Sequence, residues 1–254
     1  MKEITTEKIQ HIAASYQKAK QKLTSVIEEM RELNNAITEI NGAPISYLNL
    51  FGKQNNSDLR LTDLSDADLE RYQINLETKC WRLLLNQTDI MSKVTQDDMD
   101  KIIQDVENRK LGDFTEENII RALTELKDRE GCYIANIARE VFRFFSPNYR
   151  QKEPIPRKIV ENCSNYGSIS FSSYNSPKWE LLGKALLLLD YKPLPEQYND
   201  HLEQQMNQAV QKGEMEFECQ YFKAKFYTKS GTAHLTFTRM DLIETINKIG
   251  RISE

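Results

Sequence analysis

Three residues near the C-terminus carry side chains that could act together in acid–base chemistry. His234 lies in a β-prone run, and Arg239 and Asp241 follow it where a helix is expected to begin. A histidine that titrates near neutral pH, an aspartate that orients it and an arginine that holds an anion suit catalysis on a phosphate ester. The structural alternative is that Asp241 completes a capping box with Thr238 and that His234 bonds only to backbone. The residues alone favour this structural alternative.

A second group of residues indicates contact with phosphates. Between residues 139 and 158 the chain carries six basic and two acidic side chains, although its overall net charge is −4. Aromatic residues lie between the cations, and such mixtures hold phosphates while bases stack. The alternative is that the aromatic residues form core and the cations are solvated or paired. The candidate nucleic-acid-binding residues are Arg139, Arg143, Arg150, Lys152, Arg157 and Lys158.

Several other chemistries lack their motifs in this sequence. The nine glycines form neither the G-x-x-x-x-G-K-[ST] phosphate loop nor the G-x-G-x-x-G dinucleotide turn, and G-x-S-x-G does not occur. The four cysteines and three histidines lack the spacing that places two metal ligands on one helical face. We therefore expect no bound metal and no cofactor. The acidic net charge also limits nonspecific affinity for DNA, which depends on many phosphate contacts.

The sequence predicts a protein without membrane contact. No stretch approaches the roughly 18 consecutive apolar residues of a transmembrane helix, and mean hydropathy is −0.62. Residues 1–7 are charged and helix-like, unlike a secretory signal. We expect a cytoplasmic location.

The apolar periodicity predicts an α+β fold that is predominantly helical. Residues 1–60 are expected to form an N-terminal amphipathic helix, ending near Asn41–Pro44, and a polar loop. Residues 61–254 are expected to form an α+β domain. The apolar stripe of the first helix could dock on this domain, contact a partner protein or form a homodimer seam. We favour docking on its own domain, and the other two remain open.

The larger domain is expected to contain several capped helices and few strands. Capping boxes begin helices at Ser65–Asp68, Thr95–Asp98 and Asp113–Glu116, and a later helix ends before Pro147. A short strand is expected near 166–171, and two helices follow it. Residues 217–227 alternate with a period of two and predict one strand of a β-hairpin that spans about 216–238. A final helix follows this hairpin.

The segment from Trp81 to Asn247 resembles the bacterial domain of unknown function 4942 family. The family has a hairpin of the pattern F-K-N-G-N-x-H-L-x-F-x-R-x-D-L with an asparagine shortly after it. Thr228, Ser230 and Thr232 depart from this pattern, so the turn has drifted. Eight residues match in register: Gly231, His234, Leu235, Phe237, Arg239, Asp241, Leu242 and Asn247.

The resemblance implies a phage, prophage or plasmid context, in which such domains are sometimes joined to methyltransferase-like domains. It links the chain to DNA modification, restriction or anti-restriction and to host-defence conflict, but it carries no established activity. We therefore expect an accessory factor, not an enzyme, that binds DNA, RNA or a host or phage protein through the residues between Arg139 and Lys158. The alternative is an enzyme acting on a phosphodiester or nucleotide through His234, Arg239 and Asp241, and the resemblance raises the weight of these three residues.

Overall fold

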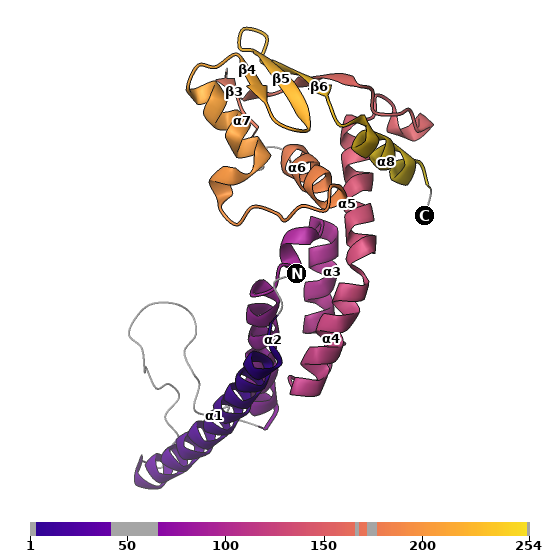
Figure 1. Ribbon diagram of the computed structural model, residues 1–254. Coiled ribbons are helices and arrows are strands. Elements are labelled where there is room, and N and C mark those ends of the chain that lie inside the picture. The colour runs from indigo at the N-terminus through magenta and orange to yellow at the C-terminus, as the bar shows by residue number, and fades with distance from the viewer. Residues whose placement is uncertain (1–3, 42–65, 166–167, 172–176, 253–254) are drawn as a thin grey trace. The chain divides into compact units, whose positions relative to one another are not determined.

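The computed structural model describes residues 4–41, 66–165, 168–171 and 177–252 (Figure 1). The chain divides into two compact units, one of residues 1–91 and 100–127 and the other of residues 92–99 and 128–254. The domain boundary expected near residue 60 and the cap expected at Ser65 lie outside the described residues. No helix in the described ranges is long and apolar enough to cross a membrane.

The first unit is helical and has an aromatic core. Its helices are α1 (Thr6–Asn41), α2 (Asp66–Asn86), and most of α3 (Gln96–Glu107) and α4 (Glu116–Asp128). Phe114 is fully buried, and its ring contacts Tyr16 at 5.2 Å and Trp81 at 5.0 Å between centroids. The backbone N–H of Phe114 donates to Glu77 Oε1 at 2.7 Å, so the buried carboxylate holds the turn before α4 against α2. Burial raises the pKa of Glu77.

Two of the expected helix starts can be compared with the structure. Thr95 Oγ1 accepts from Asp98 N at 3.2 Å, as the capping prediction requires. The third cap is shifted by two residues, because Thr115 Oγ1, not Asp113, accepts from the backbone N–H of Asn118, the third residue of α4, at 3.3 Å. The oxygen nearest the helix start takes the capping role.

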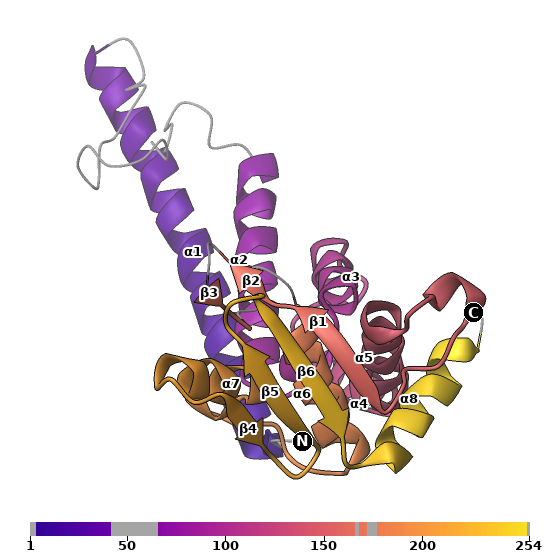
Figure 2. The ribbon, with the colours of Figure 1, turned by 90° about the horizontal axis from the view of Figure 1, so that it is seen from above.

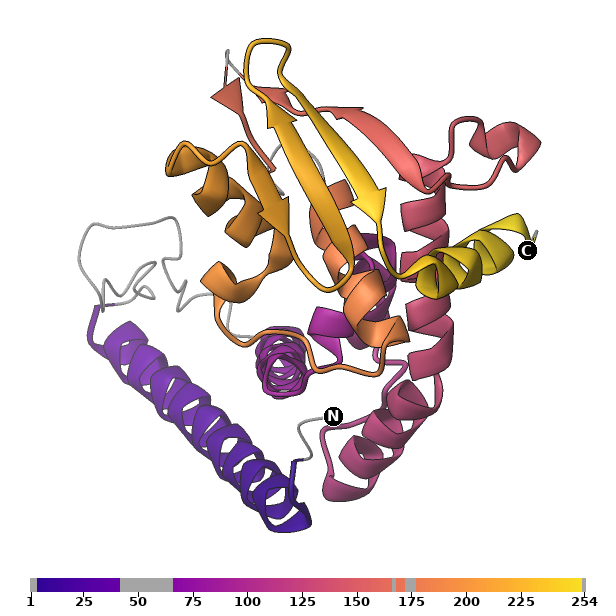
Figure 3. The ribbon, with the colours of Figure 1, turned by 45° about the horizontal axis from the view of Figure 1, so that its top comes forward.

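The second unit is built around an antiparallel sheet with the strand order β1-β6-β5-β4 (Figures 2 and 3). The α+β, mostly helical prediction is confirmed. The predicted hairpin is β5 and β6, but β1 was missed because only Ile159 of its five residues is fully buried. The strands are β1 (Lys158–Asn162), β4 (Glu216–Glu218), β5 (Phe222–Tyr227) and β6 (Thr232–Phe237). Two further strands, β2 (Ser164–Asn165) and β3 (Ser168–Ile169), pair with each other in a separate sheet. Strand β3 lies within the short strand expected near 166–171, of which residues 166–167 are outside the described part of the chain.

The prediction of a single strand over 217–227 is wrong. The chain turns back at 219–221, where Cys219 N donates to Phe222 O at 3.0 Å, and β4 then pairs with β5. The rings of Phe217 and Phe222 lie 6.0 Å apart, and both residues pack with the core. They are five positions apart in the sequence, an odd number, so one continuous strand would place them on opposite faces.

One face of the sheet is covered by helices, and no described element of the second unit covers the other, which we call the open face. Helices α5 (Glu130–Phe145), α6 (Lys178–Leu189), α7 (Leu202–Gln211) and α8 (Met240–Arg251) share a core with the inner face of the sheet. Gly250 permits the close approach of α8 to α5, because a Cβ there would lie 2.2 Å from the Phe142 ring. The four helices therefore bury the inward residues of each strand and leave the alternate ones exposed.

The segment between α5 and β1 is fastened to α8. The buried Asn247 side chain accepts from Ile155 N at 2.7 Å and donates to Ile155 O at 3.2 Å. Lys152 Nζ donates to Arg251 O at 2.9 Å, and Arg251 Nε donates to Lys152 O at 3.1 Å. These four hydrogen bonds place the basic residues that precede β1.

The hairpin turn gives the first prediction. Gly231 has a φ of +66°, and a Cβ there would lie 2.6 Å from Ser164 Cβ. Gly213 has a φ of +79° with open space around it. Gly213→Ala should cost about 1–2 kcal/mol from the left-handed backbone alone, and Gly231→Ala should cost a further ~1–3 kcal/mol from overpacking.

Urea unfolding of the two variants measures the difference. Ser164→Gly should recover part of the loss in the Gly231→Ala background, because it removes the colliding atom. Equal losses for the two alanine variants would contradict the steric account.

Candidate nucleic-acid interface

Several of the basic side chains that were expected to bind nucleic acid already contact groups of the protein. Arg139 is half-buried on α5 and donates to Asn136 Oδ1 at 2.6 Å, and Arg143 pairs with Glu140 at 2.7 Å. Arg150 lies in the 3-10 turn η3 (Tyr149–Gln151), where its hydrogen bond to Tyr149 lowers the pKa of that phenol. Together with Lys152, which is bonded to the end of α8, these residues are partly occupied by neighbours.

Arg157 and Lys158 differ from the other four. Both are exposed, and neither side chain has a hydrogen bond or an ion pair within the described ranges. Arg157 O accepts from Phe237 N at 2.9 Å, and Lys158 is the first residue of β1, opposite Thr236. The two cations therefore project from backbone that the sheet holds in place.

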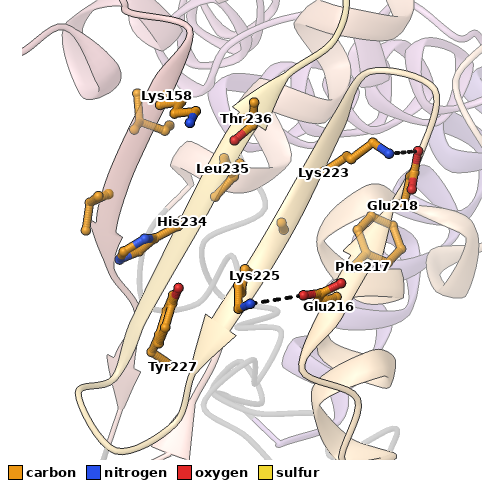
Figure 4. Close-up of a pocket in the computed structure, with 13 residues that line it drawn as sticks. Lys158, Glu216, Phe217, Glu218, Lys223, Lys225, Tyr227, His234, Leu235 and Thr236 are labelled. Carbon is orange, nitrogen blue, oxygen red and sulfur yellow. Dashed lines mark ion pairs between the residues drawn. The ribbon is translucent and has the colours of Figure 1, made fainter.

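Lys158 belongs to the open face of the sheet, which is hollowed. The hollow has a volume of about 470 Å³ and is lined by residues of all four strands (Figure 4). The strand register sets the outward side chains in rows across the sheet. These rows are Lys158–Thr236–Lys223–Glu218, Val160–His234–Lys225–Glu216 and Asn162–Thr232–Tyr227. We call these residues the outer face.

The part of the outer face next to the hairpin turn is aromatic and apolar. The rings of His234 and Tyr227 lie 4.4 Å apart between centroids with an angle of 44° between their planes. Val160, opposite His234 on β1, is 61% exposed, and Tyr227 is 39% exposed. No hydrogen bond or ion pair of the His234 side chain occurs within the described part of the chain. The outer face thus presents an open ring pair with an exposed aliphatic neighbour.

The structure brings Arg239 and Asp241 together. Arg239 Nε and Nη2 donate to the two oxygens of Asp241 at 2.9 and 2.7 Å, and Nη1 donates to Asp190 Oδ1 at 2.9 Å. These hydrogen bonds hold the pKa of both carboxyl groups below their usual value. The hydroxyl of Tyr221 donates to Asp190 Oδ2 at 3.2 Å. Burial and the negative charge of Asp190 raise the pKa of Tyr221 to about 12. The cluster joins the end of α6 to the start of α8.

His234 is not part of this cluster. Its ring contacts Tyr227 at a tilt, and Phe237, the last residue of β6, lies three positions further along the extended strand, about 10 Å away. The expected capping box is also absent, since the N-cap of α8 is Arg239 without a side-chain cap, and Thr238 Oγ1 donates to Gln220 O at 3.0 Å. Asp241 bonds to Arg239 instead, because a guanidinium offers it two parallel hydrogen bonds.

Sequence reasoning missed most of the outer face. Tyr227, Lys223 and Lys225 fall on one face of the alternating run, and this alternation was the available signal. No sequence signal pointed to Val160, because β1 itself was not predicted. Among the residues that the structure describes, no group of three or more His, Cys, Asp and Glu side chains is placed to hold a metal ion.

The chain matches a known family model over most of its second unit and part of its first. The model of a family described as domain of unknown function DUF4942 matches residues 74–253, which is more than half of the chain. No curated protein and no solved structure matches. The matched segment contains the whole sheet, residues 139–158 and the Arg239 cluster.

Seven of the eight residues that match the hairpin pattern have a role in packing or bonding. Leu235, Phe237 and Leu242 are buried, Gly231 fits against Ser164, and three polar residues make the bonds described above. These three are Arg239, Asp241 and Asn247. The eighth, His234, is exposed and contributes only its contact with Tyr227. It is therefore the matched residue that packing explains least.

The Arg239 cluster gives the second prediction. Because the pKa values of Asp190 and Asp241 lie below the usual 3.8 in the folded protein, the stabilisation is present above that pH and is lost as the pH falls through the lowered values. Arg239→Gln should therefore destabilise the protein at neutral pH, and the difference from the parent should shrink below pH 3.8. Urea unfolding at a series of pH values measures this, with Arg239→Lys retaining part of the effect. A difference that stays constant down to pH 2 would rule out the carboxylates as the cause.

Proposed function

The chain belongs to the DUF4942 family, and from that premise we propose that it is an accessory factor that binds nucleic acid with residues 139–158. The observation that carries the proposal is the pair of exposed cations Arg157 and Lys158, which have no partner in the described residues. Both project from hydrogen-bonded backbone. Cations on preorganised backbone bind phosphates at a lower entropic cost than cations on mobile segments.

Arg143 and Arg150 extend this surface. In the pair between Arg143 and Glu140 the guanidinium is exposed and the carboxylate is partly exposed. Surface pairs contribute about 0–1 kcal/mol, so a phosphate can replace the carboxylate. Each phosphate contact lowers log K by about 0.7–0.9 per decade of salt. A surface with few cations on an acidic chain therefore gives modest, salt-dependent affinity.

The biological setting is part of the proposal and is supported by the resemblance. We place the protein in the cytoplasm, in the context of a phage, prophage or plasmid, near DNA modification, restriction or anti-restriction. DNA and RNA are both candidate ligands.

A protein contact is the second candidate, and one observation favours it. Val26 and Leu33 of α1 are exposed, and their spacing of seven residues puts them on one face of the helix. A host or phage protein, or a second copy of the chain, would cover them.

The third prediction concerns the basic residues. Replacing Arg143, Arg150 and Arg157 together by alanine should weaken binding to DNA or RNA by about tenfold or more at low salt and reduce the salt slope, since three phosphate contacts are removed. Fluorescence anisotropy with labelled oligonucleotides measures both quantities.

The control variant replaces Lys8, Lys18 and Lys22 of α1, three exposed lysines, by alanine. It removes the same charge from another part of the chain and should bind like the parent. If both triple variants lost the same affinity for nucleic acid, net charge alone would explain the loss, and the assignment of the surface would be refuted.

The fourth prediction concerns α1. If it forms a homodimer seam, the parent sediments as a dimer and the Val26→Glu/Leu33→Glu variant as a monomer, because two carboxylates cannot be buried there without partners. Analytical ultracentrifugation distinguishes these states, and a monomeric parent excludes the seam.

A further inference from the structure

We infer that the outer face of the sheet is a stacking site for the bases of single-stranded nucleic acid, with Tyr227 and His234 as the stacking side chains. The inference rests on the proposed nucleic-acid-binding function and names the form of nucleic acid that it selects. Four observations carry it: an open face, an exposed ring pair, an unpaired cation at its border and the position of the acidic residues.

The open face has the size and surface that a base requires. Its hollow of about 470 Å³ is within the range of ~300–1,000 Å³ typical of ligand pockets. The floor is a β-sheet whose backbone groups pair with one another, so they do not need water there. Flat bases can therefore lie on side chains that project from this floor.

Tyr227 and His234 form an exposed pair of rings on strands whose alternate residues are buried. Tyr227 and His234 project on the face away from the core, while their neighbours Phe226, Ala233 and Leu235 are fully buried on the other face. Exposed aromatic side chains on a sheet offer a π-face to any base, and this contact tolerates different sequences. Val160, beside His234, extends the apolar platform toward β1.

Charges on the outer face set the direction in which a strand would lie. Lys158, without a partner among the described side chains, borders the platform on β1, and Arg157 precedes it. On the opposite edge, Glu218 pairs with Lys223 at 2.8 Å and Glu216 pairs with Lys225 at 3.2 Å (Figure 4). A phosphate backbone is attracted to the unpaired cations on the β1 side, whereas the carboxylates of β4 neutralise the lysines of β5, so the bases are directed toward Tyr227 and His234.

Duplex nucleic acid does not fit this arrangement, because its bases are stacked inside the helix and only its edges and phosphates are accessible. Single strands expose unstacked bases that can lie on aromatic rings. The outer face therefore discriminates by form of nucleic acid and not by sequence.

The experiment compares three labelled probes by fluorescence anisotropy at low salt. They are an oligothymidylate of about 12 nucleotides, within the usual site size of a single-strand-binding domain, an abasic backbone of the same length and a duplex of the same length. The parent should bind the oligothymidylate about tenfold more tightly than the abasic strand or the duplex, because stacking of one base adds roughly 5- to 100-fold.

The test variant is Tyr227→Ala/His234→Ala. It should lose about tenfold or more of its affinity for the oligothymidylate and keep its affinity for the abasic strand, because both substitutions remove rings and leave Lys158 in place. The matched control is Tyr191→Ala, which removes a tyrosine that is 97% exposed in the loop after α6. It should bind all three probes like the parent.

A second variant is expected to gain affinity, which loss of folding cannot mimic. Glu216→Gln/Glu218→Gln removes the carboxylates of β4 and frees both lysines, so it should bind the oligothymidylate several-fold more tightly than the parent.

Two results would overturn the inference. One is unchanged oligothymidylate binding in the Tyr227→Ala/His234→Ala variant, and the other is equal binding of duplex and single strand by the parent. If oligonucleotides still bind and the triple arginine variant still loses binding, the proposed function survives while the stacking site fails. If the parent binds no probe at low salt, both fail.

Discussion

The second unit depends on a chain of aromatic contacts that covers one face of its sheet. The ring of Phe145 on α5 lies 5.3 Å from Trp179 on α6, Trp179 lies 5.1 Å from Phe171, and Phe171 lies 5.5 Å from Phe226 on β5. Phe171, after β3, thus links the helices to the strands. Because strand side chains alternate, filling this core with every second residue leaves the remaining residues on the open face. The candidate binding surface is therefore a direct consequence of one-sided burial.

The second unit also depends on hydrogen bonds that join α8 to the segment before β1 and to the end of α6. Asn247 holds the backbone of Ile155 with two hydrogen bonds, and Arg239 joins the start of α8 to Asp190 at the end of α6. The Asn247 bonds hold the segment that leads into β1, and with it Arg157 and Lys158. Removing a buried partner from such a pair costs more than the net value of one hydrogen bond, since the other group loses its solvation. The polar residues near the C-terminus thus serve architecture, and this role favours a binding surface elsewhere.

The hairpin residues separate into structural and surface roles when their burial is compared. Leu235 and Phe237 point into the core from β6, whereas His234, which precedes them, and Thr236, which lies between them, point outward. A sequence pattern does not distinguish the buried residues from the exposed ones. The three residues first considered for catalysis divide in this way, because Arg239 and Asp241 satisfy each other's charges while His234 contacts the exposed ring of Tyr227.

Periodicity and composition alone determined the fold class, the helix starting after Thr95, the hairpin and the helix after it, because these depend on local hydrogen bonding and on which residues alternate. They also located the basic residues 139–158. Only the tertiary structure decided that Lys152 is bonded, because its partner is the carbonyl of Arg251 at the end of α8, whereas Arg143 pairs locally with Glu140 on α5. It also decided that residues 217–227 fold back and that β1 joins the sheet, since a mostly exposed edge strand gains its hydrogen bonds from β6 and leaves little pattern in its own residues.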